Sequence, residues 1–167
     1  RLLSVIIITT QCFFPKIGGI ESLMTGMADA MSNVGKDVLV LADGKKILDD
    51  DNKKYKIKRF SGWKPYRRRS KAAYLKEFIS NNSVETIYAD SWKSIEYLGG
   101  LKIKVIVLAH GTEIPKQYWS KVFNLVRFKK NRIISAYSNS DEIIANSSYT
   151  KDLMQVSLNI KREKIKI

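Results

Sequence analysis

Short runs of apolar residues alternate along the chain with longer segments in which apolar residues recur every three or four positions. The runs have the length and continuity of strands that are buried on both faces of a parallel sheet. They lie at residues 2–8, 37–42, 86–89, 104–108 and 142–145. Residues 55–60 alternate basic with apolar side chains instead, which predicts an edge strand.

The segments between the runs carry helix signals. Helical spacing covers residues 20–34 and 118–132, and shorter helices are predicted within residues 72–79, 94–98 and 149–156. Asn146, Ser147 and Ser148 form a natural cap for the last of these helices. Six strands that alternate with helices predict an α/β fold. We expect one Rossmann-like, doubly wound parallel sheet flanked by helices, in a single domain over residues 1–167.

Two charged stretches lie outside this pattern. Residues 45–54 include Asp49, Asp50 and Asp51 in a row, and they predict an exposed excursion rather than a metal site because no other ligands flank them. Residues 161–167 alternate lysine with isoleucine, and no element is predicted there.

Composition narrows the classes of function. The net charge of +14 favours an anionic partner such as a nucleotide, a nucleic acid or a membrane surface, although abundant lysine, isoleucine and asparagine fit compositional drift of the source genome equally well. Cys12 is the only cysteine, so no internal disulfide can form and a reducing cytoplasm is favoured. The sequence has no cysteine and histidine cluster for zinc, and the apolar run at residues 5–8 is too short to cross a bilayer.

The stretch FFPKIGGIE, residues 13–21, lies between the first strand and the first long helix. A helix start offers free N–H groups and partial positive charge to a phosphate or carboxylate. Gly18 and Gly19 lack side chains that would keep such a ligand from the backbone. The same glycine pair is compatible with a tight turn that needs positive φ.

Other polar residues follow the predicted strands directly. Asp90 follows the fourth strand, His110 and Glu113 follow the fifth, and Ser147 follows the sixth. Ligands of doubly wound sheets bind beyond the carboxyl ends of the strands. These residues and the glycine pair are therefore predicted to meet at one edge of the sheet, where His110 is the only histidine of the chain.

Residues 63–71, WKPYRRRSK, combine basic with aromatic side chains. Arg67, Arg68 and Arg69, with Lys71 close behind, suit an anionic lipid surface or a nucleic-acid backbone. A solvated helix start explains the same residues.

Four segments together resemble the amino-terminal domain of the GT-B glycosyltransferases, in particular the large retaining group called family 4 or group 1. They are FFPKIGGIE after the first strand, VGKDVLVLA at the end of the first long helix, HGTE after a central strand and SDEIIANSSYTKDLM near the end. The resemblance spans nearly the whole chain. Its specificity comes from the order and spacing of the segments rather than from any one of them.

The resemblance implies an activity and a role for each candidate residue. The intact enzyme would transfer a sugar, with retention, from a nucleotide-diphosphate-sugar to a saccharide or lipid-linked acceptor, in cell-surface polysaccharide or lipopolysaccharide synthesis. Gly18 and Gly19 would lie near the donor diphosphate. His110 would be the catalytic residue of the cleft, orienting hydroxyls and stabilising charge rather than acting as a nucleophile. Asp90 and Glu113 would contact the acceptor.

The resemblance also implies a missing half and several partners. In this family a carboxyl-terminal domain with paired glutamates holds the nucleotide, so the chain is expected to be the acceptor-side domain without it, inactive alone. No cofactor, metal or nucleic acid is implied. Relatives with lipid-linked acceptors dock on the inner face of a membrane, so residues 67–69 are predicted to make that contact in a cytoplasmic, peripheral membrane protein.

Two other classes of function stay open at this point. A binding module for nucleic acid or another anionic polymer explains the charge, but it leaves the glycine pair and HGTE unexplained. Another nucleotide-sugar enzyme of the GT-B fold, such as an epimerase, fits the same strand-end residues. A dehydrogenase is disfavoured because the first loop lacks the G-x-G-x-x-G spacing.

Overall fold

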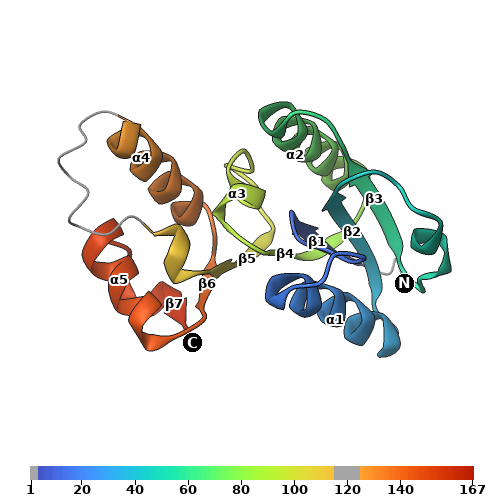
Figure 1. Ribbon diagram of the computed structural model, residues 1–167, viewed down its shortest axis with the longest axis horizontal. Helices are drawn as coiled ribbons and strands as arrows, with labels where there is room; N and C mark the ends of the chain where they lie inside the picture. The colour runs from blue at the N-terminus through green and yellow to red at the C-terminus, as the bar shows by residue number, and fades with distance from the viewer. Residues whose placement is uncertain (1–3, 115–124) are drawn as a thin grey trace.

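The computed structural model of the chain describes residues 4–114 and 125–167. The described residues form one sheet of seven parallel strands in the order β3-β2-β1-β4-β5-β6-β7 (Figure 1). The strands are β1 (Val5–Thr10), β2 (Asp37–Asp43), β3 (Lys56–Phe60), β4 (Val84–Ala89), β5 (Lys104–Ala109), β6 (Glu142–Ala145) and β7 (Ile165–Lys166). The helices are α1 (Gly19–Asn33), α2 (Lys64–Asn81), α3 (Trp92–Ile95), α4 (Leu125–Ser138) and α5 (Ser148–Leu158). Short 3-10 turns cover Leu48–Asn52, Gly111–Glu113 and Arg162–Lys164.

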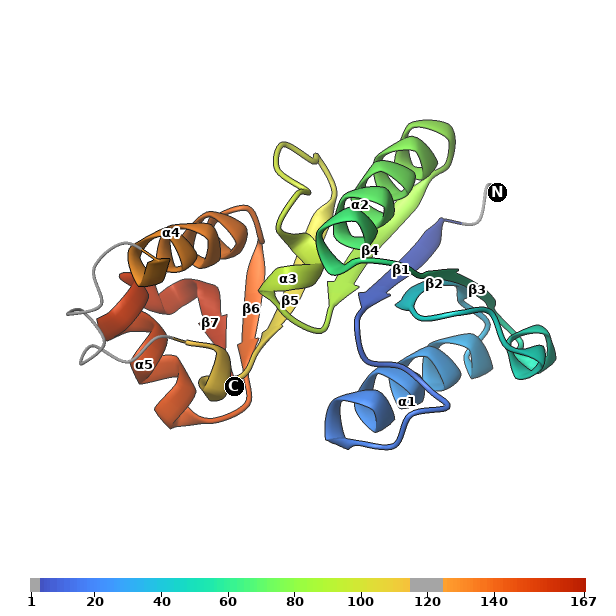
Figure 2. The same cartoon turned by 45° about the horizontal axis from the view of Figure 1, so that its top comes forward.

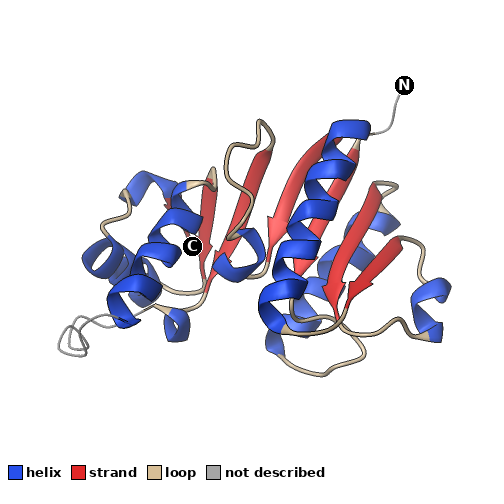
Figure 3. Ribbon diagram, turned by 90° about the horizontal axis from the view of Figure 1, so that it is seen from above, coloured by secondary structure: helices blue, strands red, loops and turns tan. Residues whose placement is uncertain are grey.

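This architecture confirms the predicted Rossmann-like, doubly wound α/β fold. The order reverses at β1, which lies between β2 and β4, and Figure 3 shows the strands side by side with helices on both faces of the sheet. β3 is an edge strand, as its alternating sequence predicted. All pairs are parallel, so the loops that follow the strands emerge at one edge, which we call the carboxyl edge.

An apolar core lies on each face of the sheet because successive strand residues point to opposite sides. Ile7 of β1 belongs to the larger core, which includes Leu75 of α2 and Tyr137 of α4. Its neighbour Ile8 belongs to the smaller core, which includes Met24 of α1. Figure 2 shows α1 and α2 on opposite sides of β1, in agreement with this division.

Several predicted bounds differ from the structure. β1 ends at Thr10 rather than Ile8, and residues 2 and 3 of its predicted range lie outside the described residues. The same holds for residues 118–124 of the predicted helix over 118–132, which the structure describes as α4 from Leu125 to Ser138. α3 begins two residues earlier than predicted. β7 was missed because two residues give no apolar run, and it pairs with β6.

The prediction of an exposed excursion over residues 45–54 is wrong at one position. The 3-10 turn Leu48–Asn52 places Asp49 and Asp51 on the surface but buries Asp50. Three adjacent aspartates look alike in the sequence, and only the packing against β3 separates them.

Candidate active site at the carboxyl edge of the sheet

The glycine pair lies at the start of α1, as predicted. Gly18 is the N-cap with φ 177°, which is ordinary extended backbone, and Gly19 is the first helical residue. Neither lies in the left-handed region of positive φ that favours glycine, so the alternative of a turn that requires glycine is wrong. The Glu21 carboxylate reaches back beside Gly18, where the positive end of the helix dipole favours negative charge. A phosphate at this helix start would therefore replace the Glu21 carboxylate as the neighbour of Gly18.

Phe13 and Phe14, which lead into the glycine loop, are anchored to α1 and β3. Phe13 is buried in the smaller core, where its ring meets those of Phe14 and Tyr55 edge to face. The Phe14 amide donates to Thr25 Oγ1 of α1 at 3.3 Å, and the Phe14 carbonyl accepts from Nη2 of Arg59 on β3 at 2.8 Å. The position of the glycine loop thus depends on side chains from α1 and β3.

Arg59 is held by a buried ion pair. Its Nε and Nη2 donate to the two oxygens of Asp50, each at 2.7 Å, and the two side chains are only 4% and 1% exposed. Burial opposes the charge of Asp50, but the hydrogen bonds from Arg59 and from the Ile47 amide outweigh it and lower the pKa of the Asp50 carboxyl. The bidentate geometry aims the rest of the guanidinium at the Phe14 carbonyl.

Asp90 follows β4 at the carboxyl edge, but its carboxylate faces inward. One oxygen accepts from the Gln11 amide at 2.8 Å and from Thr10 Oγ1 at 3.0 Å, and the other accepts from Ser94 Oγ at 2.5 Å. Burial raises the pKa of this carboxyl above its usual range despite these hydrogen bonds. Because the Asp90 carboxylate is buried and hydrogen-bonded on both oxygens, it does not face a ligand in this structure, in contrast to the acceptor contact expected from sequence. It instead fixes Thr10 and Gln11, where the chain leaves β1.

His110 follows β5, and its side chain contacts the backbone of Asp90. Its Nε2 lies 3.0 Å from the Asp90 carbonyl oxygen. A carbonyl oxygen only accepts hydrogen bonds, so Nε2 carries the hydrogen, and in the neutral form of an imidazole with this tautomer Nδ1 is an acceptor. No hydrogen bond to Nδ1 forms among the described residues. Asp90 therefore links the loop after β1 with the loop after β5. Its side chain accepts from the Gln11 amide, and its carbonyl oxygen orients His110.

Glu113 lies in the same loop as His110 and is partly buried. One carboxylate oxygen accepts from Lys93 Nζ of α3 at 2.8 Å, and the other has no hydrogen-bond partner among the described residues. The loop approaches α5 closely, because a Cβ on Gly111 would lie 2.9 Å from Thr150 Oγ1. Ser147 caps α5 as predicted, its hydroxyl accepting from the Thr150 amide.

The basic cluster at residues 63–71 belongs to the first turns of α2, and much of its charge is neutralised. Arg67 Nε donates to Asp43 at 2.8 Å. The buried Lys71 pairs with the same carboxylate at 2.5 Å and donates to the Thr10 carbonyl at 2.8 Å. Burial lowers the pKa of Lys71, and the Asp43 charge opposes that shift. Sequence reasoning grouped Lys71 with surface cations, whereas the structure makes it a buried anchor of β1.

The other two arginines differ in exposure. Arg68 pairs with Glu96 at 3.3 Å, and Glu96 also pairs with Arg132. Arg69 is exposed and its guanidinium lies 5.4 Å from the centre of the Tyr97 ring. Of the three arginines predicted to meet a membrane, two are committed to internal ion pairs.

The described residues contain no group of three or more histidine, cysteine, aspartate or glutamate side chains that could hold a metal ion. Among those same residues, no helix has the length and apolar character needed to cross a membrane.

Known structures share this fold. HepE from Anabaena, in complex with UDP, matches with a TM-score of 0.64 and 15% identity over 96% of this chain and 42% of that chain. WaaB, a lipopolysaccharide outer core galactosyltransferase in its apo form, matches with a TM-score of 0.63 and 13% identity over 98% of this chain and 44% of that chain. The wall teichoic acid polymerase TagF matches with a TM-score of 0.56 and 10% identity, over 99% of this chain and 37% of that chain. The chain thus spans less than half the length of these proteins.

These likenesses confirm the fold expected of a GT-B glycosyltransferase domain. A comparison with curated proteins finds no match. A family model described as Glycosyltransferase Family 4 matches residues 17–167, which is nearly the whole chain. The chain therefore belongs to Glycosyltransferase Family 4.

Proposed function

We propose that this chain is the acceptor-side domain of a retaining glycosyltransferase. The enzyme transfers a sugar from a nucleotide-diphosphate-sugar to a saccharide or lipid-linked acceptor of the cell surface. Family membership supports the transferase class. The fold is shared with HepE, which has been solved in complex with UDP-glucose, and with WaaB, a lipopolysaccharide galactosyltransferase. These relatives support a donor of the nucleotide-sugar class and an acceptor that is a surface polysaccharide or lipopolysaccharide.

The observation that carries the proposal is the orientation of His110. Its ring is held at the carboxyl edge by the Asp90 carbonyl, with Nδ1 left as an acceptor. A hydrogen-bond acceptor beside a sugar can orient a hydroxyl and stabilise positive charge that develops on the ring in the transition state. His110 is therefore the catalytic residue of this domain. We assign Asp90 the role of positioning residue and keep Glu113 as the acceptor contact.

The donor lies in the cleft between this domain and a second domain, across from the acceptor contacts of this domain. Gly18 and Gly19 approach its diphosphate from this domain, and a second, carboxyl-terminal domain holds the nucleotide. Helix-end dipoles and basic side chains of that domain balance the diphosphate charge without a metal ion. The chain by itself then binds acceptor weakly and nucleotide hardly at all. Micromolar binding of a nucleotide diphosphate to the chain alone, measured by calorimetry, would contradict the proposal that the second domain holds the nucleotide.

The test is sugar transfer by the protein that carries both domains. His110→Ala should lower kcat by about a hundredfold or more, which is the usual effect of losing one charge-stabilising contact. Lys36→Gln, an exposed lysine at the amino edge of the sheet, is the matched control and should leave kcat unchanged.

The products decide between the rival enzymes. Nuclear magnetic resonance of the anomeric proton should show transfer to an acceptor with retained configuration. Release of an epimerised sugar nucleotide would favour the epimerase instead. Unchanged turnover in His110→Ala would remove His110 from the catalytic site.

A further inference from the structure

Four large apolar side chains are exposed on the segments that follow β1, β2 and β3 at the carboxyl edge. Ile17 lies in the loop after β1 and is 98% exposed, and Leu48 lies in the loop after β2 and is 89% exposed. Trp63 and Tyr66 lie at the start of α2, after β3, and are 76% and 67% exposed. These two are three residues apart at a helix start and are therefore neighbours on its surface.

The three loops are fastened to one another. The Gly44 amide donates to the Phe60 carbonyl at 2.8 Å, which joins the loop after β2 to the end of β3. Arg59 binds both Asp50 and the Phe14 carbonyl, which joins the loops after β1 and β2. The exposed side chains are thus displayed by a braced surface rather than by independent loops.

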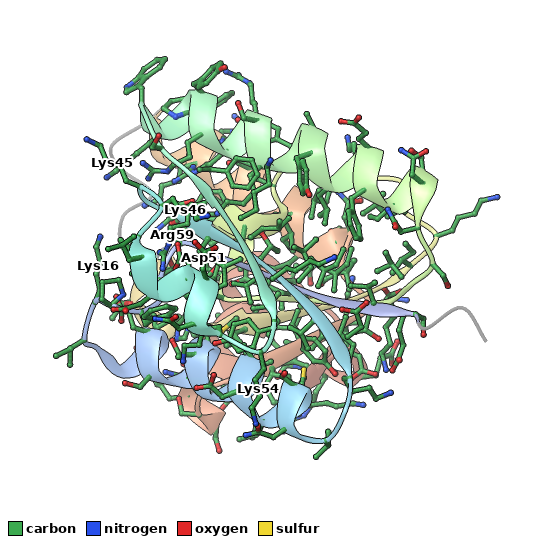
Figure 4. All side chains as sticks on the ribbon, turned by 90° about the vertical axis from the view of Figure 1, so that its right-hand side faces the viewer. Lys16, Lys45, Lys46, Asp51, Lys54 and Arg59 are labelled. Carbon is green, nitrogen blue, oxygen red and sulfur yellow. The ribbon has the colours of Figure 1, made fainter. Side chains whose placement is uncertain are left out.

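Lysines accompany the apolar side chains. Lys16, Lys45 and Lys64 are exposed and form no ion pair among the described residues, whereas Lys46 pairs with Asp51 at 2.9 Å. Figure 4 shows Lys16 and Lys45 along one margin of the molecule. The exposed carboxylates on the same loops, Asp49 and Asp51, are fewer than the lysines, so the margin is positive. We call Lys16, Ile17, Lys45, Leu48, Trp63, Lys64 and Tyr66 the amphipathic rim.

We propose that the amphipathic rim docks the protein on an anionic lipid surface. Moving almost fully exposed isoleucine and leucine side chains from water to the boundary between lipid headgroups and acyl chains lowers the free energy. Tryptophan and tyrosine favour the headgroup level, where the ring is apolar on one side and the polar atom stays wet. Unpaired lysines beside them add attraction to anionic headgroups. Each residue type of the rim has a place in such an interface.

This surface differs from the one predicted by sequence. Arg67 and Arg68 form ion pairs with Asp43 and Glu96, so their charge is largely neutralised within the domain. The rim instead recruits residues from the loops after β1 and β2, which no local sequence pattern connects with residues 63–66. Vesicle binding requires neither donor nor acceptor, so its outcome is independent of the proposed sugar transfer.

Co-sedimentation of the chain with vesicles tests the apolar part of the rim. The chain should bind vesicles of phosphatidylglycerol and phosphatidylcholine in equal parts more tightly than vesicles of phosphatidylcholine alone. Ile17→Ser with Leu48→Ser should weaken that binding by about tenfold or more. Val34→Ser with Val156→Ser removes two exposed valines elsewhere and should leave it unchanged.

A second pair of variants separates the rim from the overall charge. Replacing Lys16, Lys45 and Lys64 with glutamine should weaken binding by roughly fivefold per lysine. The same change at Lys54, Lys56 and Lys102, exposed at the amino edge, removes equal charge and should have little effect. Equal losses in both triple variants, or equal binding to both vesicle types, would overturn the proposal.

Two other occupants of the rim give distinct results. Tight binding of a random oligonucleotide that is lost in the lysine variant but kept in Ile17→Ser with Leu48→Ser would identify a polyanion and overturn the membrane assignment. A dimer that dissociates in that apolar variant, seen by analytical ultracentrifugation without lipid, would identify a second copy of the chain and overturn it as well.

Discussion

The buried pair between Asp50 and Arg59 offers a sharp test of how the edge of the sheet is held together. Asp50→Asn keeps the shape of the side chain but leaves the Arg59 guanidinium without its charge partner in a position that is 4% exposed. Breaking a buried ion pair in this way typically costs about 3–5 kcal/mol. For a domain of this size that corresponds to a fall in Tm of roughly 6–20 °C.

The two neighbouring aspartates supply the control. Asp49 is exposed and makes one hydrogen bond, accepting from Asn52 at 3.4 Å, so Asp49→Asn should change the free energy of unfolding by no more than about 0.5 kcal/mol. Urea denaturation followed by circular dichroism measures both variants. Equal stability of Asp49→Asn and Asp50→Asn would refute the assignment of Asp50 as a buried partner of Arg59.

The pH dependence adds a second readout. The pKa of Asp50 is lowered in the folded state, so its contribution to stability is present above the unfolded value of 3.8 and is lost as pH falls through the lower folded value. The wild-type chain should lose this stability in acid, and Asp50→Asn should lack that part of the pH dependence. A parallel acid profile in the two proteins would show that the carboxylate is not stabilised by its pair.

Three further predictions concern the loops of the carboxyl edge. Burial raises the pKa of Cys12 to about 11, so its alkylation at pH 8 should be roughly a hundredfold slower than that of a peptide thiol, and a comparable rate would mean that the thiol is open to solvent. Gly18→Ala should lower the free energy of unfolding by less than about 1 kcal/mol, because its backbone is extended and only the flexible end of Glu21 must move; a loss of several kcal/mol in urea denaturation would contradict this. Ser147→Ala should cost about 1 kcal/mol by removing the cap on the Thr150 amide, and an unchanged Tm would exclude that role.

The elements of the sheet were readable from local pattern because burial on both faces demands consecutive apolar residues. This is why β6 was predicted at its observed bounds and β3 was recognised as an edge. Ser147 was readable for a similar reason, since a cap acts on amides only a few residues away. The carboxyl edge could be predicted as the place of a site, because parallel strands with helical crossovers leave no other common edge for their following loops.

Side-chain direction and exposure could not be read in this way. Asp90 and His110 were both placed correctly at strand ends. Whether the Asp90 carboxylate faces solvent or the start of the loop after β1 depends on Thr10 and Gln11, which are distant in sequence. Lys71 looked like its neighbouring arginines until Asp43 and Thr10 were brought to it.

Local periodicity thus determined the fold class, the order of the elements and the edge at which ligands meet the sheet, because these follow from spacing along the chain. The tertiary structure alone decided which charged groups are buried, which nitrogen of His110 is open and which loops share the amphipathic rim. Those properties depend on contacts between residues that are separated along the chain, by nine positions for Asp50 and Arg59 and by 61 for Lys71 and Thr10, and no local pattern names these partners.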